Sequence, residues 1–256
     1  MDIFLKMGRK PLNILDSNSL SSLLSEFGNK PVIFQSESQF QFDLAWRLQE
    51  EYDCKVLLED LSMVITREKG SKQKIYTDII LEHPEYRIAI ELKYKTAEIE
   101  SGDIILLNHG ATDLGRFDYL WDVHRVEMLV DSIIVNTEMQ TSNVSDISIR
   151  KPCDKGFAIL LTNEKSYWEK CWQTCGDTID RQFCIGTNKK DGTGQLFSNT
   201  VNWRINKGQY PKTVGGTARG RSIPLKKQYS YQWKDYSILQ SGKDTSIFKY
   251  LIIETN

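Results

Sequence analysis

Residues 76–95, "YTDIILEHPEYRIAIELKYK", form two apolar runs that are each interrupted by charged side chains. Isoleucine, leucine and tyrosine dominate both runs, as is typical of buried β-strands. Asp78, Glu91 and Lys93 nevertheless lie inside the runs rather than at their ends. A charge inside a buried strand costs several kcal/mol unless it is paired or binds a metal ion. The stretch therefore predicts two strands that carry a charged site.

The turn between the two strands decides how these charges are placed relative to one another. Side chains alternate across a strand, so Glu91 and Lys93 share one face, about 7 Å apart along the strand. If the turn has two residues, at His83 and Pro84, or four residues, from Glu82 to Glu85, Asp78 pairs with Ala89 and lies diagonal to Glu91, within reach of one divalent cation. If the turn has three residues, Asp78 leaves this face and the cluster dissolves.

The rest of the chain alternates helical and strand-like segments, and Ser36 is a plausible N-cap for the second helix. The predicted helices cover 17–28, 37–52, 113–130 and 164–175, and the predicted strands cover 55–65, 75–82, 86–95, 155–163, 229–239 and 246–254. This order predicts a mixed α/β fold. We divide the chain into an N-terminal helical extension, a core, and a basic loop-rich extension that packs on the core, over residues 1–30, 31–184 and 185–256.

The pattern of acidic residues and lysine resembles that of a known superfamily. Asp78 on one strand, the triplet Glu91-Leu92-Lys93 on the next, and an acidic preceding helix resemble the PD-(D/E)XK nuclease superfamily, the fold of many restriction endonucleases. The resemblance covers about half of the chain, and Thr77 stands where the name of the motif has proline. It implies a restriction endonuclease-like α-β-β-β-α-β core with a mixed sheet.

The resemblance also implies roles for individual residues. Asp78 and Glu91 would bind Mg²⁺, for which Mn²⁺ is expected to substitute, and Lys93 would be catalytic. Many members of the superfamily add a metal-binding acidic residue on the first helix, which here is Glu37, and Gln41 flanks it one turn later. The implied function is that of a Mg²⁺-dependent endonuclease that hydrolyses DNA phosphodiester bonds with a metal-activated water.

The charge of the chain is unevenly distributed. The formal net charge is -1, yet residues 185–256 hold twelve lysines and arginines against four aspartates and glutamates. Within that part, residues 202–233 interleave basic side chains with glycine, tyrosine and tryptophan, a composition that suits contact with a phosphate backbone. The basic residues expected to contact DNA are Arg219, Arg221, Lys226, Lys227, Lys207 and Lys212.

Two other functions stay open at this point: a catalytically silent nuclease-fold module that binds nucleic acid, and an α/β interaction protein without a nucleic-acid role. A homodimer is also left open. The segment "GTNKKDGTG", 186–194, lacks the GxxxxGK[ST] pattern of a phosphate loop. None of the three histidines has a partner at metal-ligand spacing.

The sequence favours neither a membrane protein nor a secreted one. No apolar run approaches the roughly 20 residues that span a bilayer, and the N-terminus lacks the apolar core of a secretory signal. We therefore expect a cytoplasmic protein that has no membrane partner. The five cysteines have irregular spacings, which favours reduced thiols over a zinc site built from Cys171, Cys175 and Cys184.

Overall fold

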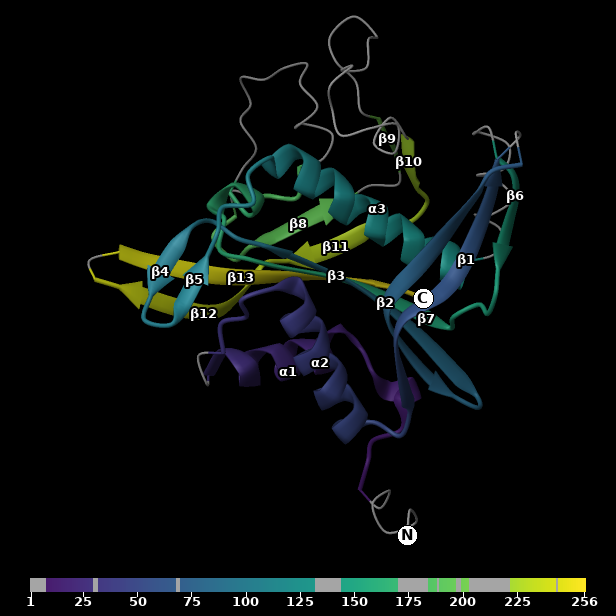
Figure 1. Cartoon of the computed structure of the whole chain (residues 1–256), viewed down its shortest axis with the longest axis horizontal. Coiled ribbons are helices and arrows are strands. Elements are labelled where there is room, and N and C mark those ends of the chain that lie inside the picture. Colours follow the sequence, from purple (N-terminus) through teal and green to yellow (C-terminus); the bar gives the residue numbers. More distant parts are fainter. Residues whose placement is uncertain are drawn as a thin grey trace, which may run out of the picture.

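A seven-stranded mixed sheet forms the centre of the protein in the computed structural model (Figure 1). The structure describes residues 8–29, 32–67, 70–131, 144–169, 184–187, 189–196, 199–202, 222–242 and 244–256. The strands of the sheet are, in chain order, β1 (Lys55–Arg67), β2 (Lys72–His83), β3 (Tyr86–Lys95), β6 (Val144–Ile149), β7 (Lys155–Thr162), β12 (Lys234–Ser241) and β13 (Asp244–Thr255). Their order across the sheet is β12-β13-β7-β3-β2-β1-β6.

Only one pair of neighbouring strands in this sheet, β3 and β7, runs parallel, and the other pairs are antiparallel. Three α-helices lie in the described ranges: α1 (Ser17–Asn29), α2 (Glu37–Glu51) and α3 (Thr112–Val130). A parallel pair needs a crossover connection, and α3 lies in the connection between β3 and β7. The predicted α/β class is therefore confirmed.

Helices cover both faces of the sheet, with α1 and α2 on one side and α3 on the other (Figure 1). The alternation along β3 explains this arrangement. Ile88, Ile90 and Leu92 join the core beneath α1 and α2. Ala89, which points the other way, joins the core beneath α3. Glu91 has the same parity as Ala89, so its side chain lies on the α3 side of the sheet.

Shorter elements complete the described structure. The 3-10 helices are η1 (Leu12–Ile14) and η2 (Lys165–Tyr167), and the short strands are β4 (Ile99–Ser101), β5 (Ile104–Leu106), β8 (Thr193–Leu196), β9 (Asn199–Asn202), β10 (Ser222–Leu225) and β11 (Tyr229–Gln232). These strands form three two-stranded sheets, β4-β5, β8-β11 and β9-β10. The C-terminal strands β12 and β13, in contrast, extend the central sheet beyond β7.

The predicted helix boundaries agree closely with the structure at the first two helices. Ser36 caps α2 by accepting a hydrogen bond from the backbone N–H of Gln39 at 3.1 Å. The predicted helix over 17–28 ends at Gly28, but in the structure α1 continues to Asn29 and Gly28 lies within it. A Cβ at this position would lie 1.8 Å from the backbone oxygen of Tyr236 on β12, so the glycine allows helix and strand to approach closely.

Two predicted elements differ from the structure. The expected helix over 164–175 begins as the 3-10 helix η2, and its remainder from residue 170 lies outside the described residues. The expected single strand over 229–239 is divided between two sheets at Trp233. Trp233 is 4% exposed and its indole N–H donates to the backbone oxygen of Ile185 at 2.7 Å.

The turn between β2 and β3 corrects the predicted register. The loop consists of Pro84 and Glu85, and His83 pairs with Tyr86. Ala89 therefore pairs with Ile80 rather than with Asp78, so that expectation was wrong by two positions. The backbone N–H of Glu85 donates to the His83 ring at 3.2 Å, which closes the turn one step later than expected. A shift of two residues keeps every side chain on its face.

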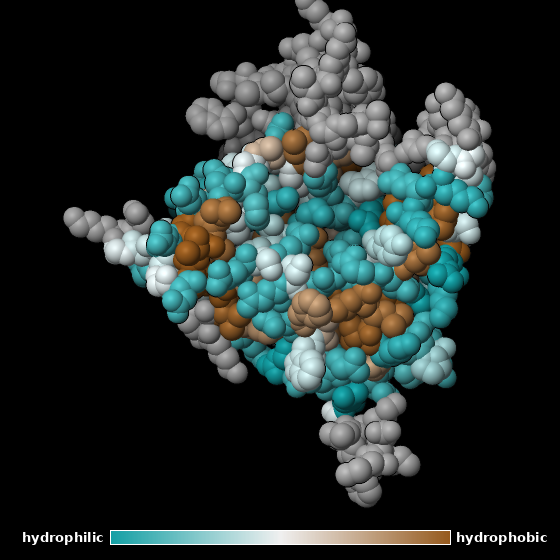
Figure 2. All heavy atoms as spheres, in the orientation of Figure 1, coloured by the Kyte–Doolittle hydropathy of each residue, from teal (hydrophilic) through white to brown (hydrophobic). Residues whose placement is uncertain are grey.

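Polar side chains cover most of the molecular face seen in Figure 2, and apolar side chains gather on it in separate patches. The large hydrophobic side chains exposed among the described residues are Ile14, Phe42, Trp46, Tyr76, Ile105, Leu107 and Ile238. They belong to several different elements, so the apolar exposure is divided rather than concentrated. No helix in the described ranges is both long enough and apolar enough to cross a membrane.

Candidate functional site

The β1–β2 ladder is interrupted where Glu59 and Asp78 oppose each other. Leu58 pairs with Ile79 on one side of the interruption, and pairing resumes beyond it. Glu59 has a φ of 49°, in the left-handed region that L-residues seldom adopt. The β2–β3 ladder likewise ends at the pair Ile79–Ile90, one step before Asp78. The main chain at Asp78 is therefore left out of both ladders, which is a feature common at functional sites.

Side chains replace the missing ladder bonds at Asp78. Its carboxylate Oδ2 accepts a hydrogen bond from the backbone N–H of Leu92 at 2.6 Å. Its backbone oxygen accepts one from the Gln41 side-chain amide at 2.7 Å. The same amide donates to Glu59 Oε1 at 3.0 Å. Gln41, predicted from the sequence as a site residue, thus fixes the sheet interruption from α2 and is 8% exposed.

Glu37, at the start of α2, lies at the end of the site nearest Tyr94. Its Oε2 accepts a hydrogen bond from the backbone N–H of Tyr94 at 2.7 Å. Its charge also raises the pKa of Lys93. The prediction that the first helix supplies a carboxylate to this region is consistent with this placement, although the carboxylate is bonded to the strand backbone.

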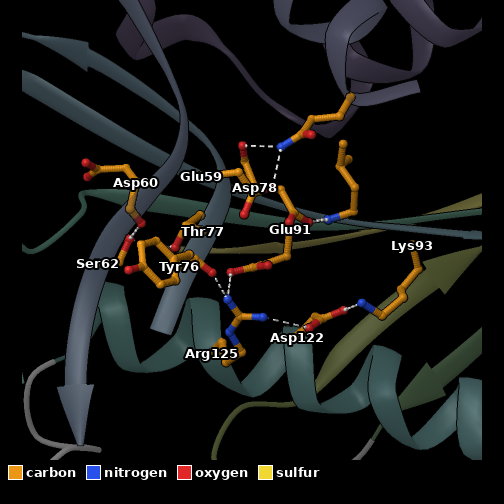
Figure 3. Close-up of polar contacts among 12 residues, drawn as sticks. Glu59, Asp60, Ser62, Tyr76, Thr77, Asp78, Glu91, Lys93, Asp122 and Arg125 are labelled. Carbon is orange, nitrogen blue, oxygen red and sulfur yellow. Dashed lines mark hydrogen bonds and ion pairs between the residues drawn. The ribbon is translucent and has the colours of Figure 1, made fainter. Parts of the chain in front are cut away.

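A chain of ion pairs joins β3 to α3 (Figure 3). Glu91 Oε1 lies 2.8 Å from Arg125 Nη2, and Arg125 Nη1 lies 3.2 Å from Asp122 Oδ1. Asp122 Oδ2 in turn lies 3.0 Å from Lys93 Nζ. The side chains of Glu91 and Asp122 are 1% and 3% exposed. Every charge buried on this face of β3 therefore has a partner of opposite sign.

Burial dominates the electrostatics of the two predicted metal-binding carboxyls. Desolvation raises the pKa of Asp78 to about 6, although the hydrogen bond from Leu92 works against this rise. Desolvation likewise raises the pKa of Glu91 well above its ordinary value, against the attraction of Arg125, while Asp78 and Asp122 add to the rise. The three carboxyls thus lie close enough for their charges to oppose one another.

The two cations show the opposite balance. Burial works to lower the pKa of Lys93, but Asp122 and Glu37 outweigh it, and the pKa is raised. Burial also works to lower the pKa of Arg125, and Glu91 and Asp122 again raise it. The carboxylates around them therefore favour the charged form of both side chains.

Sequence reasoning missed the contribution of α3 to the site. The site residues predicted from the sequence include neither Asp122 nor Arg125. The structure places Arg125 against Asp122 and Glu91. The spacing of three between Asp122 and Arg125 on one helix was the available signal, but it does not reveal which strand they face.

Glu127 on α3 contacts the turn between β10 and β11. This fully buried carboxylate accepts hydrogen bonds from the backbone N–H of Lys227 at 3.1 Å and from the hydroxyl of Tyr229 at 2.8 Å. The backbone N–H of Lys226 lies 3.3 Å from the same carboxylate. Glu127 therefore fastens the turn between β10 and β11 to α3.

Two of the six basic residues expected to contact DNA lie in described parts of the chain. Lys226 is exposed, and the Lys227 ammonium donates to the Thr255 hydroxyl at 3.4 Å and to the backbone oxygen of Asn256. The others, Lys207, Lys212, Arg219 and Arg221, lie outside the described residues.

Thr77, at the position where the name of the motif has proline, is buried in β2. It pairs with Asp60 in the β1–β2 ladder and accepts a hydrogen bond from the Ser62 hydroxyl at 2.7 Å. Cys54 and Cys153 are free thiols whose pKa is raised by burial to about 11. The expectation of reduced thiols is wrong for Cys184, which is disulfide-bonded.

The carboxylate oxygens of the cluster are the type of ligand that a hard divalent cation prefers. Their present positions, however, do not surround a single point at which an ion could bind. Within the described residues, no group of three or more histidine, cysteine or carboxylate side chains is arranged to hold a metal ion. The buried Oε1 of Glu91 makes no hydrogen bond, because its contact with Arg125 is an ion pair without hydrogen-bond geometry. The cluster has four carboxylates and two cations: Glu37, Asp78, Glu91 and Asp122 against Lys93 and Arg125.

Comparison with family models, curated proteins and solved structures finds no match for this chain, so the chemistry of the site is argued from its own residues.

Proposed function

We propose that this protein is a Mg²⁺-dependent phosphodiesterase of the restriction endonuclease-like fold that cleaves DNA, with Mn²⁺ able to replace Mg²⁺. The observation that carries the proposal is the proximity of Asp78, Glu91 and Lys93 on the α3 side of two adjacent strands, next to an interruption of the sheet. The elements α2, β1, β2, β3, α3 and β7 follow one another in this order, with only the short pair β4-β5 and the edge strand β6 between them among the described residues, and β3 is parallel to β7, which supports the α-β-β-β-α-β core.

The charge of the cluster supports a divalent cation as the missing partner. When all its groups are ionised, four carboxylates face two cations, and the surplus of negative charge equals the charge of one Mg²⁺. Oxygen ligands from one or two carboxylates are what Mg²⁺ uses in proteins. Asp78 and Glu91 would hold the ion, and burial together with neighbouring carboxylates raises the pKa of both carboxyls, which a bound cation would oppose.

The proposed chemistry divides among the residues of the cluster. A bound Mg²⁺ would polarise a phosphoryl oxygen and lower the pKa of a water molecule. Lys93, whose charged form is favoured by Asp122 and Glu37, would stabilise negative charge on the attacked phosphate. Asp122 holds Lys93 Nζ at 3.0 Å and so orients it from α3. Gln41 keeps Asp78 out of the ladder, which leaves its carboxylate at the site.

A cleavage assay with a matched pair of lysine variants tests the proposal. Lys95 lies two residues beyond Lys93 on the same face of β3. With supercoiled plasmid DNA and Mg²⁺, wild type and Lys95→Met should cleave, and Lys93→Met should lose cleavage by about 100-fold or more while still binding DNA. Addition of EDTA should stop all cleavage. Equal cleavage by Lys93→Met and Lys95→Met would refute the assignment of Lys93.

A catalytically silent nucleic-acid-binding module is the second candidate. The observation that favours it is that Glu91 and Lys93 are both already in ion pairs with residues of α3. Salt-dependent DNA binding without cleavage under any divalent cation would support this alternative. Absence of DNA binding at low salt would instead favour an interaction protein without a nucleic-acid role.

A further inference from the structure

We propose that Arg125 acts as a built-in substitute for the metal ion: it occupies Glu91 when no metal is present, and a divalent cation must displace its guanidinium from Glu91 to bind. This inference rests on the proposed metal site of Asp78 and Glu91. It assigns to Arg125 a positioning role that controls metal affinity.

The contacts of Arg125 show which of its bonds is replaceable. Its guanidinium pairs with Asp122 at 3.2 Å with hydrogen-bond geometry and also donates to the backbone oxygen of Tyr76. The contact with Glu91 at 2.8 Å is an ion pair only, because Glu91 Oε1 makes no hydrogen bond among the described residues. Release of Glu91 would therefore cost Arg125 no hydrogen bond.

The buried position of Glu91 favours a cation beside it whenever the carboxyl is ionised. Its side chain is 1% exposed, and an unpaired carboxylate in such a place is strongly destabilising. Arg125 supplies the positive charge from α3, and its own side chain is 15% exposed, which leaves it a path toward solvent. The close-up view shows Arg125 rising from α3 to meet Glu91 between the helix and the sheet (Figure 3).

The guanidinium occupies Oε1 of Glu91, so a metal ion that binds this oxygen competes with Arg125 for it. Asp122 would keep Arg125 paired after its contact with Glu91 is lost. It already binds Arg125 through Oδ1 and Lys93 through Oδ2. After exchange, Arg125 would stay paired with Asp122 while Glu91 turns to the metal.

Calorimetric titration of Mn²⁺ into the metal-free protein tests the exchange. Arg125→Gln removes the competing charge and should bind Mn²⁺ about tenfold tighter than wild type, or more, since a unit charge at contact distance changes affinity by at least this factor. Arg47→Gln is the matched control, because Arg47 on α2 also pairs with two carboxylates, Glu26 and Glu50, at the surface. It should bind Mn²⁺ as wild type does.

A second measurement uses the wild-type protein and so does not depend on the folding of a variant. Phenylglyoxal modifies accessible arginines, and peptide mapping reports each site. Saturating Mn²⁺ should increase modification of Arg125 severalfold and leave Arg47 unchanged. An extent of Arg125 modification that does not change on addition of Mn²⁺ would overturn the inference.

The outcomes separate this inference from the proposed function. If wild type binds Mn²⁺ and Arg125→Gln binds it no tighter, the exchange is wrong and the metal site stands. If neither protein binds Mn²⁺, the proposed metal site fails and the exchange fails with it. If Arg125→Gln does not fold, the phenylglyoxal result in wild type decides.

Discussion

The guanidinium of Arg125 on α3 lies 2.8 Å from the carboxylate of Glu91 on β3. This pair joins the helix to the strand at a point where Glu91 is almost completely buried. The same helix also holds Lys93 through Asp122. The state of the candidate site is therefore set by α3 as much as by the two strands that carry its acidic residues.

Stability in the absence of metal should fall as the pH rises from about 4 to about 6. The pKa of Asp78 is about 6 in the folded protein and 3.8 ordinarily, so the unfolded chain loses this proton first and unfolding becomes easier over that interval. Asp78→Asn should then be more stable than wild type at pH 8, by at most about 3 kcal/mol, and equal to it near pH 4.

Urea unfolding in EDTA at several pH values measures this difference. Asp103→Asn, at the exposed turn between β4 and β5, is the control and should track wild type throughout. A constant difference between Asp78→Asn and wild type at every pH would contradict the raised pKa.

Removal of Asp122 should destabilise the protein strongly. Asp122→Ala leaves Lys93 and Arg125 buried against α3 without their shared partner, and loss of one member of a buried ion pair typically costs about 3–5 kcal/mol. Glu26→Ala removes a partner of Arg47 at the surface and should cost less than about 1 kcal/mol. Thermal and urea unfolding of the two variants make the comparison, and similar losses would show that the buried pairs are not coupled to folding.

Glu127 should be essential for the packing of the turn between β10 and β11. Glu127→Ala leaves the backbone N–H of Lys227 and the hydroxyl of Tyr229 without their buried acceptor, and should cost about 3 kcal/mol or more. Tyr229→Phe removes one of these donors together with its bond and should cost only about 1 kcal/mol. Hydrogen exchange at Lys227 should accelerate in Glu127→Ala alone.

The basic C-terminal part should determine the salt dependence of DNA binding. Neutralising Arg219, Arg221, Lys226 and Lys227 to glutamine should lower the slope of log affinity against log salt by about 0.9 for each phosphate of duplex DNA that the protein no longer neutralises. Lys10→Gln with Arg47→Gln, which lie at or near α2, is the control. An unchanged slope in the first variant would mean that these residues are ordinary surface.

The sequence by itself determined the local elements and the faces of the strands. Period-two alternation is a property of a single strand, so it placed Glu91 and Lys93 together on one side of β3 without any tertiary information. The cap at Ser36 and the periodicity behind it located α2 in the same way. These features depend on residues close to one another in the chain.

Only the tertiary structure decided the register and the partners. The turn closes at Pro84 and Glu85, one step later than expected, and His83 pairs with Tyr86 across it. Short turns that differ by one residue in position have similar local sequence signals. The pairing of Glu91 with Arg125 depends on how α3 packs over β3, since a helix surface can present its charges to any strand beneath it. The packing of distant elements determines which charged partner a buried residue meets, so local sequence patterns do not predict it.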